Sequence, residues 1–320
     1  MGFDNFISFV YATILAGVPI LYGTLGEIII EKSGNLNLGV EGMMYLGAIF
    51  GFIAAFTLQN AFAAILAGFL AGVLGALIYA FLTVSLKANQ NVTGLTLTVF
   101  GTGVANFLGE RMKMNSPVGS VIIEDAILRP LLPLNMGALT EIPVIGKLLF
   151  NHSILTYFAI FCAIAMSLYL NRTQKGLNLR AIGENPAAAD AMGIDVNRYK
   201  YLHILFGGGL CGIGGVYVSL VTCVGNWQPD IIGGQGWIAV ALVIFASWKP
   251  LRAVFGSLVF GALSMLRLYI PKDIIDIPGS IFNMLPFVVT CLVLLISSIK
   301  MKRENQQPAA CGVNYFREER

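Results

Sequence analysis

Residues 61–86, AFAAILAGFLAGVLGALIYAFLTVSL, contain no charged side chain and are long enough to cross a lipid bilayer as a helix. The rest of the chain has the same character. Of its 320 residues, 57% are hydrophobic and 12% are charged, which is about half the charged fraction of ordinary soluble domains. The sequence therefore predicts an all-α polytopic membrane protein.

Nine apolar runs are the expected membrane spans. They lie at 6–30, 38–57, 61–86, 92–109, 153–171, 201–224, 236–247, 253–270 and 281–299. The run at 236–247 is too short to cross a bilayer alone, and the run at 38–57 opens with polar residues. We therefore expect about eight to ten transmembrane helices, with broken or re-entrant segments.

The expected division is one transmembrane domain over 1–303, with a first half at 1–152 and a second at 153–303, followed by a cytoplasmic tail at 304–320. A basic loop at 172–200 is placed on the cytoplasmic side, because Lys and Arg mark that side of a membrane protein. Alternation then puts the N-terminus outside and the C-terminus inside. Of the 20 basic residues, those that fall outside are Arg111, Lys113, Arg129, Lys147, Arg267 and Lys272.

The centre of this loop, Gly176–Ile194, reads GLNLRAIGENPAAADAMGI and predicts a short helix. Asn185 is a good N-cap residue, and Pro186 follows at the first helical position, where its missing N–H costs nothing. An alanine-rich run favours helix, and Gly193 can end it in a left-handed conformation. A rigid helix displayed at a membrane face is suited to docking into a partner.

A second polar stretch, residues 31–47, places asparagine, glycine and glutamate where a membrane helix is expected to be apolar. Backbone that leaves its helix inside a membrane must be satisfied by protein or by a water-lined cavity. We expect a broken or re-entrant segment that lines the transport path, with Asn35, Asn37 and Glu41 as its polar contributors.

These polar residues also have plainer interpretations. Glu27 and Glu31 can be interfacial, and Glu41 can extend to the cytoplasmic surface. Trp248 is expected in the aromatic belt at the membrane interface, and His152 at the surface.

Two further stretches offer polar side chains. Residues 87–97, KANQNVTGLTL, supply Asn89 and Asn91, which can line the path or cap the helix that follows. Residues 225–237, GNWQPDIIGGQGW, supply amides and an aromatic face suited to a nucleobase and ribose. The candidates there are Asn226, Gln235 and Trp237.

Glycine has two expected roles. Small residues at four-residue spacing, Gly208 and Gly212 on one row and Gly207, Cys211 and Gly215 on another, predict close helix packing. The pair Gly34-Asn35 has a counterpart in Gly225-Asn226, as expected for an inverted repeat whose two breaks meet at a shared midplane site.

The sequence lacks the motifs of several classes of function. There is no phosphate-binding loop and no nucleophile motif, and the five cysteines lack metal-ligand or redox spacing. No metal site is expected. The net charge of +3 is too small to indicate nucleic-acid binding. The spans also lack the chain of ionisable groups typical of a proton relay.

Three of these stretches together resemble one family. Residues 184–194, ENPAAADAMGI, are similar to the coupling loop of ABC-importer permeases of the branched-chain amino acid, simple sugar and nucleoside group. Residues 33–44, SGNLNLGVEGMM, and residues 233–261 resemble two further signatures of that group, most closely in its guanosine-type nucleoside permeases. The coupling residues that the resemblance implies are Gly183, Glu184, Asn185, Pro186, Ala187, Ala188, Asp190 and Gly193.

The resemblance implies a multi-pass protein of a prokaryotic cell membrane that performs no chemistry itself. ATP and Mg would be bound by a separate ATPase, and this chain would hold no cofactor. The other implied partners are a second, related permease in a heterodimer and an extracytoplasmic substrate-binding lipoprotein docking near 110–152. A ribose-type sugar permease is the alternative within the family, and a gradient-driven carrier is the alternative outside it.

Overall fold

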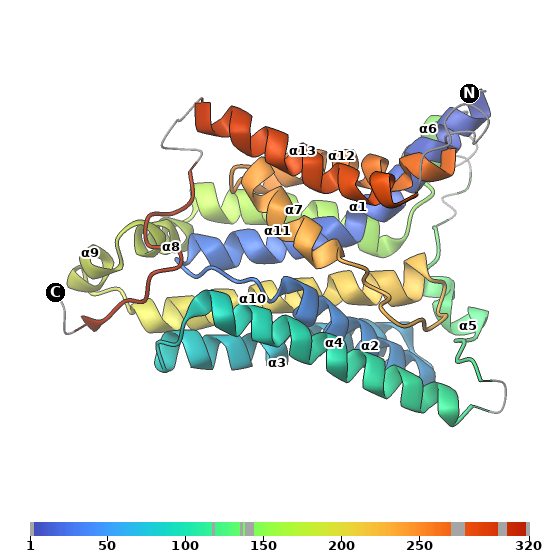
Figure 1. The fold of residues 1–320 in the computed structure, drawn as a ribbon, viewed down its shortest axis with the longest axis horizontal. Coiled ribbons are helices and arrows are strands. Elements are labelled where there is room, and N and C mark those ends of the chain that lie inside the picture. The colour runs from blue at the N-terminus through green and yellow to red at the C-terminus, as the bar shows by residue number, and fades with distance from the viewer. Residues whose placement is uncertain are drawn as a thin grey trace.

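The computed structural model describes residues 3–116, 119–134, 137, 144–269, 279–299 and 306–317. The helices form an elongated bundle, with the C-terminus beside α9 at one end and the N-terminus at the other (Figure 1). The described helices that are long and apolar enough to cross a membrane are α1 (Phe3–Lys32), α2 (Val40–Leu58), α3 (Ala61–Ala80), α4 (Gln90–Met114), α7 (Ile154–Arg172), α10 (Val196–Val216) and α12 (Pro250–Tyr269).

Shorter helices occupy the two ends and one interior position. They are α5 (Asp125–Leu128), η2 (Arg129–Leu131), α6 (Ile145–Leu149), α8 (Gln174–Glu184), α9 (Pro186–Ala191) and α11 (Gln235–Phe245). Two π-helical turns, η1 (Phe81–Ser85) and η4 (Tyr217–Thr222), continue α3 and α10, and α13 (Gly279–Ile299) is the last long helix.

The all-α polytopic prediction is confirmed. Seven helices of the described part are long and apolar enough to cross a membrane, and α11, with 11 residues, is shorter, as the sequence indicated. Each of the nine expected spans coincides with a helix. Of the basic residues expected on the outer side, Lys272 lies outside the described residues.

Glycine lets α10 lie directly against α2 and α3. A Cβ atom built on Gly212 would stand 2.2 Å from the carbonyl oxygen of Gly68, and one on Gly208 would stand 2.3 Å from the Cβ of Ala76. A Cβ atom built on Gly26 of α1 would likewise stand 2.4 Å from the carbonyl oxygen of Gly207. The predicted close packing of the glycine rows is therefore confirmed.

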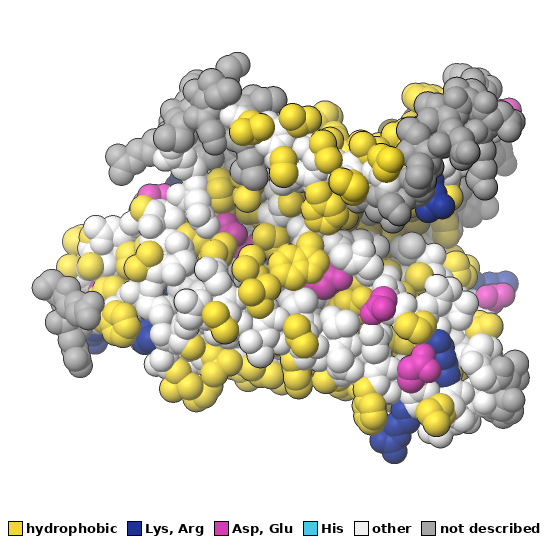
Figure 2. Space-filling view, in the orientation of Figure 1, with side chains coloured by type: hydrophobic (Ala, Val, Ile, Leu, Met, Phe, Trp, Pro, Cys, Tyr) yellow, Lys and Arg dark blue, Asp and Glu magenta, His cyan; other side chains and the backbone are white. Residues whose placement is uncertain are grey.

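The opposite face of α3 carries large side chains. Phe62, Leu66, Leu70 and Leu74 repeat every four residues and are 49–66% exposed. The lower edge of the space-filling view, over α3, is correspondingly hydrophobic (Figure 2). Small residues inside and large ones outside are what a helix needs when lipid, rather than water, surrounds the bundle.

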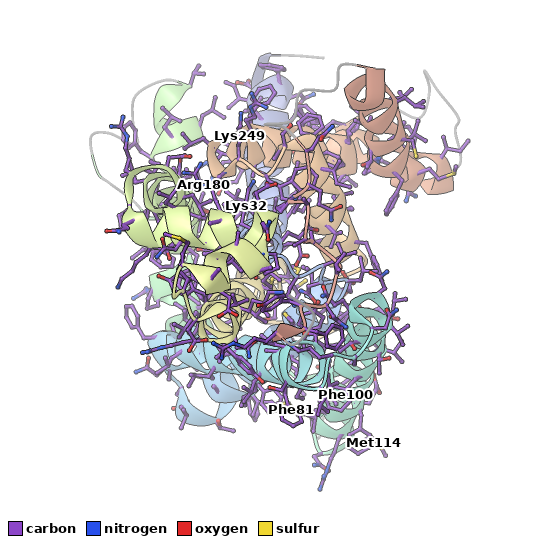
Figure 3. All side chains as sticks on the ribbon, turned by 90° about the vertical axis from the view of Figure 1, so that its left-hand side faces the viewer. Lys32, Phe81, Phe100, Met114, Arg180 and Lys249 are labelled. Carbon is purple, nitrogen blue, oxygen red and sulfur yellow. The ribbon has the colours of Figure 1, made fainter. Side chains whose placement is uncertain are left out.

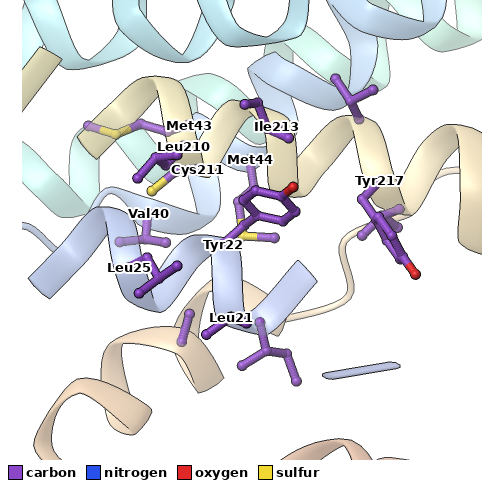
Figure 4. Close-up of a cluster of buried hydrophobic side chains, with 14 of the residues drawn as sticks. Leu21, Tyr22, Leu25, Val40, Met43, Met44, Leu210, Cys211, Ile213 and Tyr217 are labelled. Carbon is purple, nitrogen blue, oxygen red and sulfur yellow. The ribbon is translucent and has the colours of Figure 1, made fainter. Parts of the chain in front are cut away.

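The central cluster joins α1, α2 and α10. Tyr22, Met44 and Leu210 are fully or almost fully buried there, as the close-up shows (Figure 4). The Tyr22 hydroxyl donates to the carbonyl oxygen of Leu155 at 2.6 Å, which ties α7 to the same core.

The surface prediction for His152 is wrong. Its ring is 2% exposed and stacks on Tyr11 with the centroids 4.8 Å apart. Burial lowers the pKa of His152. It is a packing residue between the start of α7 and the first helix.

We predict that Gly212→Ala destabilises the bundle. The added methyl group has no room against the Gly68 backbone, and overpacking of this kind costs roughly 1–3 kcal/mol or more. Gly103→Ala on α4 is the matched control, because nothing lies within 4 Å of a Cβ at that position. Thermal unfolding of the purified variants in detergent measures the effect, and equal melting temperatures would contradict the packing argument.

Candidate functional site

The chain leaves its helical path between α1 and α2, at residues 33–39. This segment, the first break, is enclosed by the bundle, so protein groups must satisfy its backbone. Gln90 accepts from the Leu36 amide at 2.7 Å, and the Tyr79 hydroxyl donates to the Leu36 carbonyl oxygen at 2.6 Å. The Thr98 hydroxyl donates to the Leu38 carbonyl oxygen at 2.9 Å. Helices α3 and α4 thus hold the first break in place.

A carboxylate of α1 completes that support. Glu27 accepts from the backbone amide and from the side-chain amide of Asn37, both at 3.0 Å. The Asn37 side-chain oxygen in turn accepts from the Gly39 amide at 2.9 Å, directly before α2 begins. Asn37 therefore links the end of α1 to the start of α2.

The interfacial interpretation of the acidic residues on α1 is wrong. Glu27 is fully buried and Glu31 is 2% exposed. The indole N–H of Trp248 donates to the Glu31 carboxylate. Trp248 is itself 7% exposed, so its expected place in the interfacial belt is wrong as well.

The second break, residues 223–234, precedes α11. Glu41 of α2, the helix that follows the first break, contacts the start of α11. The two carboxylate oxygens of Glu41 accept from the amides of Gly234 at 2.8 Å and Gly236 at 2.6 Å. These amides belong to the N-terminal turn of α11, where a helix has unpaired donors and favours a negative charge. Glu41 is 5% exposed, so it does not extend to the surface.

Two of the other predicted path residues carry unsatisfied polar atoms. The side-chain oxygens of Asn35 and Gln235 are buried and have no hydrogen-bond partner. Gln235 lies in the α11 turn that Glu41 caps, and the half-buried Trp237 follows two residues later. The structure therefore brings Glu41, Gln235 and Trp237 together.

The remaining candidates lie elsewhere. Asn89 is the N-cap of α4, where its side chain accepts from the Val92 amide at 3.1 Å, and Asn91, the second residue of α4, is exposed. Asn226 pairs with Ile122 in an isolated β-bridge at the opposite end of the bundle. Capping is the interpretation of Asn89 that the geometry favours. The inverted repeat stays a prediction.

The helix predicted inside the 172–200 loop is α9. Asn185 caps it by accepting from the Ala188 amide at 3.0 Å, Pro186 is its first residue, and Gly193 beyond its end has a φ of +82°. Ala188 is exposed, whereas Ala189 is buried against α8 and α10. The local rules for capping and termination were sufficient to predict this element.

Sequence reasoning missed the role of residues 306–317, the tail segment. The Tyr315 hydroxyl donates to the Asp190 carboxylate of α9 at 2.8 Å, and Arg317 pairs with the same oxygen at 3.2 Å. The Ala310 amide donates to the Gly183 carbonyl oxygen at 2.9 Å, and the Asn314 side chain donates to the Lys87 carbonyl oxygen at 2.6 Å. The tail segment therefore fastens α8, α9 and the start of α4 together.

A hollow of about 770 Å³ lies between α7 and α10. Phe158, Phe161, Leu202 and Phe206 are part of its apolar lining. None of the eight predicted path residues lines this hollow, so it is not evidence for a solute path within the single chain.

Comparison with known proteins places these features in a family. The family model described as the permease component of the branched-chain amino acid transport system matches residues 9–294 of this chain. The chain belongs to this family. Its members are membrane components of transport systems, so the chain is a transport permease and not an enzyme.

Three relatives are similar over most of the chain. The nucleoside ABC transporter permease NupC of Lactococcus lactis is 34% identical over 99% of both chains. The guanosine ABC transporter permease NupQ of Bacillus subtilis is 32% identical over 88% of this chain and 89% of its own. TsgC13 of Haloferax volcanii, named as a glucose ABC transporter permease, is 37% identical over 80% of this chain and 76% of its own.

We predict that Glu41→Ala loosens the start of α11. The variant leaves two amides without their acceptor, and a hydrogen bond to a charged group contributes roughly 1.5–3 kcal/mol. Hydrogen exchange at Gly234 and Gly236 should become faster, while exchange in the centre of α10 stays slow. Glu110→Ala is the control, because Glu110 is an exposed acid that pairs with Lys113 on α4. Unchanged exchange at the two glycines would refute the capping role.

Proposed function

We propose that this chain is a permease subunit of an ABC importer that carries nucleosides into the cell. The observation that carries the proposal is the similarity to the L. lactis nucleoside permease, which extends over 99% of both chains. The B. subtilis relative, named for guanosine, supports the same substrate class.

In the proposed assembly, a separate ATPase binds ATP and Mg and docks on α9. A second, related permease completes the membrane core, and a substrate-binding lipoprotein delivers solute from outside. The proposed orientation places α8, α9 and the tail segment in the cytoplasm. These elements lie together at one end of the bundle, as that arrangement requires (Figure 1).

Motion of α9 has a continuous packed route to both breaks. Helix α9 follows α8, and α8 lies so close to α1 that a Cβ on Gly183 would stand 2.5 Å from the Lys32 carbonyl oxygen. The first break begins directly after Lys32, and Glu41 connects the residues beyond that break to α11. We propose that closure of the ATPase displaces this series of elements as a unit.

For the solute, we propose contacts at the α11 turn and the first break. The unpaired amide oxygens of Gln235 and Asn35 can accept hydrogen bonds from a base or a ribose, and the half-buried ring of Trp237 can stack on a base. In this proposal Glu41 positions the turn, because its carboxylate is already occupied by two amides.

A simple sugar is the second candidate substrate. It is favoured by the 37% identity to the Haloferax protein named for glucose transport. The two substrate classes share hydroxyl groups but differ in the flat aromatic base, so competition between them discriminates the candidates.

We predict that the assembled transporter takes up labelled guanosine and that excess unlabelled adenosine reduces this uptake, while excess ribose or glucose does not. Liposomes that contain the permeases, the ATPase and the binding protein, with ATP inside, provide the measurement. Liposomes without the ATPase are the control. Blocking by ribose or glucose alone would favour the sugar candidate, and uptake driven by an ion gradient without the ATPase would refute the ABC mechanism.

We predict that Ala188→Arg uncouples ATP hydrolysis from the binding and transport of solute. Ala188 is exposed on α9, so the variant should fold, but an unpaired charge in a packed interface costs several kcal/mol. Ligand-stimulated hydrolysis should fall by about tenfold or more, since each 1.4 kcal/mol is a factor of ten. Gln174→Arg, at an exposed position of α8, is the control for added charge at the same end. Full stimulation in the Ala188 variant would remove α9 from the docking surface.

A further inference from the structure

Three basic side chains that are distant in the sequence gather at the α9 end of the bundle. Lys32 ends α1, Arg180 lies on α8, and Lys249 lies in the turn before α12. Viewed from that end, Lys249, Arg180 and Lys32 lie near one another in the upper half of the molecule (Figure 3). All three line one hollow of about 400 Å³, which we call the basic hollow.

Within the part of the chain that the structure describes, the cations lining the basic hollow form no ion pair. Glu184 also lines it, so the lining carries three cations and one anion. The ion pairs of the described residues are Lys113–Glu110 and Arg317–Asp190, and neither involves these cations. Glu31, whose carboxylate accepts from the Trp248 indole, and Glu184 both attract Lys32 through space.

The lack of acceptors for these cations is most direct at Arg180. Its Nε atom is buried and has no hydrogen-bond partner. A guanidinium group cannot lose its charge in a protein and carries five N–H donors in a fixed plane. A buried donor without an acceptor is costly, so this geometry favours an incoming group that supplies oxygen atoms and negative charge.

The walls of the basic hollow are formed by several elements. Ser247 and Trp248 have φ values of 50° and 54°, a left-handed conformation that is uncommon for such residues, and this turn presents Lys249 to the hollow. Asn171 at the end of α7 and Pro308 of the tail segment close other sides. An occupant would therefore contact α1, α8 and the start of α12 at once.

We propose that the basic hollow binds a phosphate-bearing anion. A phosphate group offers several oxygens to one planar guanidinium and to lysine point charges, which is the usual division between these two side chains. The volume leaves room for more than the phosphate itself, so a small phosphate ester or a phospholipid headgroup fits. By joining α8 to α1 and α12, the bound anion restrains the elements that connect α9 to the two breaks.

This inference does not depend on which solute is carried. The first arm of the test uses the purified chain in detergent, titrated with inorganic phosphate or glycerol 3-phosphate at constant ionic strength against chloride. We expect a saturable rise in melting temperature. Arg180→Gln and Lys249→Gln should weaken the apparent affinity by about tenfold each, since one charge-assisted hydrogen bond contributes about 1.5 kcal/mol or more.

The controls are Arg172→Gln and Lys175→Gln, which remove exposed cations from the same end and should leave the affinity unchanged. Lys249→Arg keeps the charge and should retain binding, so loss of fold is separated from loss of the site. The lipid arm compares nanodiscs of phosphatidylcholine with nanodiscs that also contain phosphatidylglycerol.

Stabilisation by the soluble phosphates identifies a soluble ligand. Stabilisation by phosphatidylglycerol alone, lost in Arg180→Gln, identifies a lipid headgroup. The proposal is overturned if no phosphate compound stabilises the protein beyond chloride, or if the Arg180 and Lys249 variants respond as the wild-type protein does. Failure of nucleoside uptake would not alter either result.

Discussion

The structure depends on satisfying backbone that leaves its helices inside a membrane bundle. Residues 33–39 are such a departure: they are enclosed by the bundle, and Gln90, Tyr79, Thr98 and Glu27 pair their amides and carbonyls. The Glu41 carboxylate, on the helix after this first break, caps the helix after the second break, residues 223–234, which are themselves partly exposed. A single residue thus makes the two halves of the chain structurally dependent on each other.

Much of the fold follows from local rules. Runs such as 61–86 and 281–299 are apolar over the length of a span, and each became a helix. The glycine rows of residues 205–215 predicted close packing because a missing side chain leaves room that only a neighbouring backbone can fill. Helix α9 was predictable because the cap at Asn185 and the terminator at Gly193 act within a few residues of the helix itself.

The errors share one physical cause. A charged or polar side chain near a span end is cheapest at the interface, and only a distant partner makes its burial possible. Glu31 finds that partner in Trp248, 217 residues away, and Asn314 finds carbonyl acceptors at Lys87, 227 residues away. No local pattern identifies such pairs. The roles of Asn35 and Gln235 as solute contacts stay predictions for the same reason, since a solute is a partner outside the chain.

The tail segment joins α8 and α9 to the start of α4. Its contacts with Gly183, Asp190 and the Lys87 carbonyl reach α8, α9 and the start of α4. Residues 306–317 follow every described helix in the chain. The spans can therefore insert during synthesis before these residues are made, but this end of the bundle cannot finish its packing until they have been added. The α9 surface is in this way completed only after the spans.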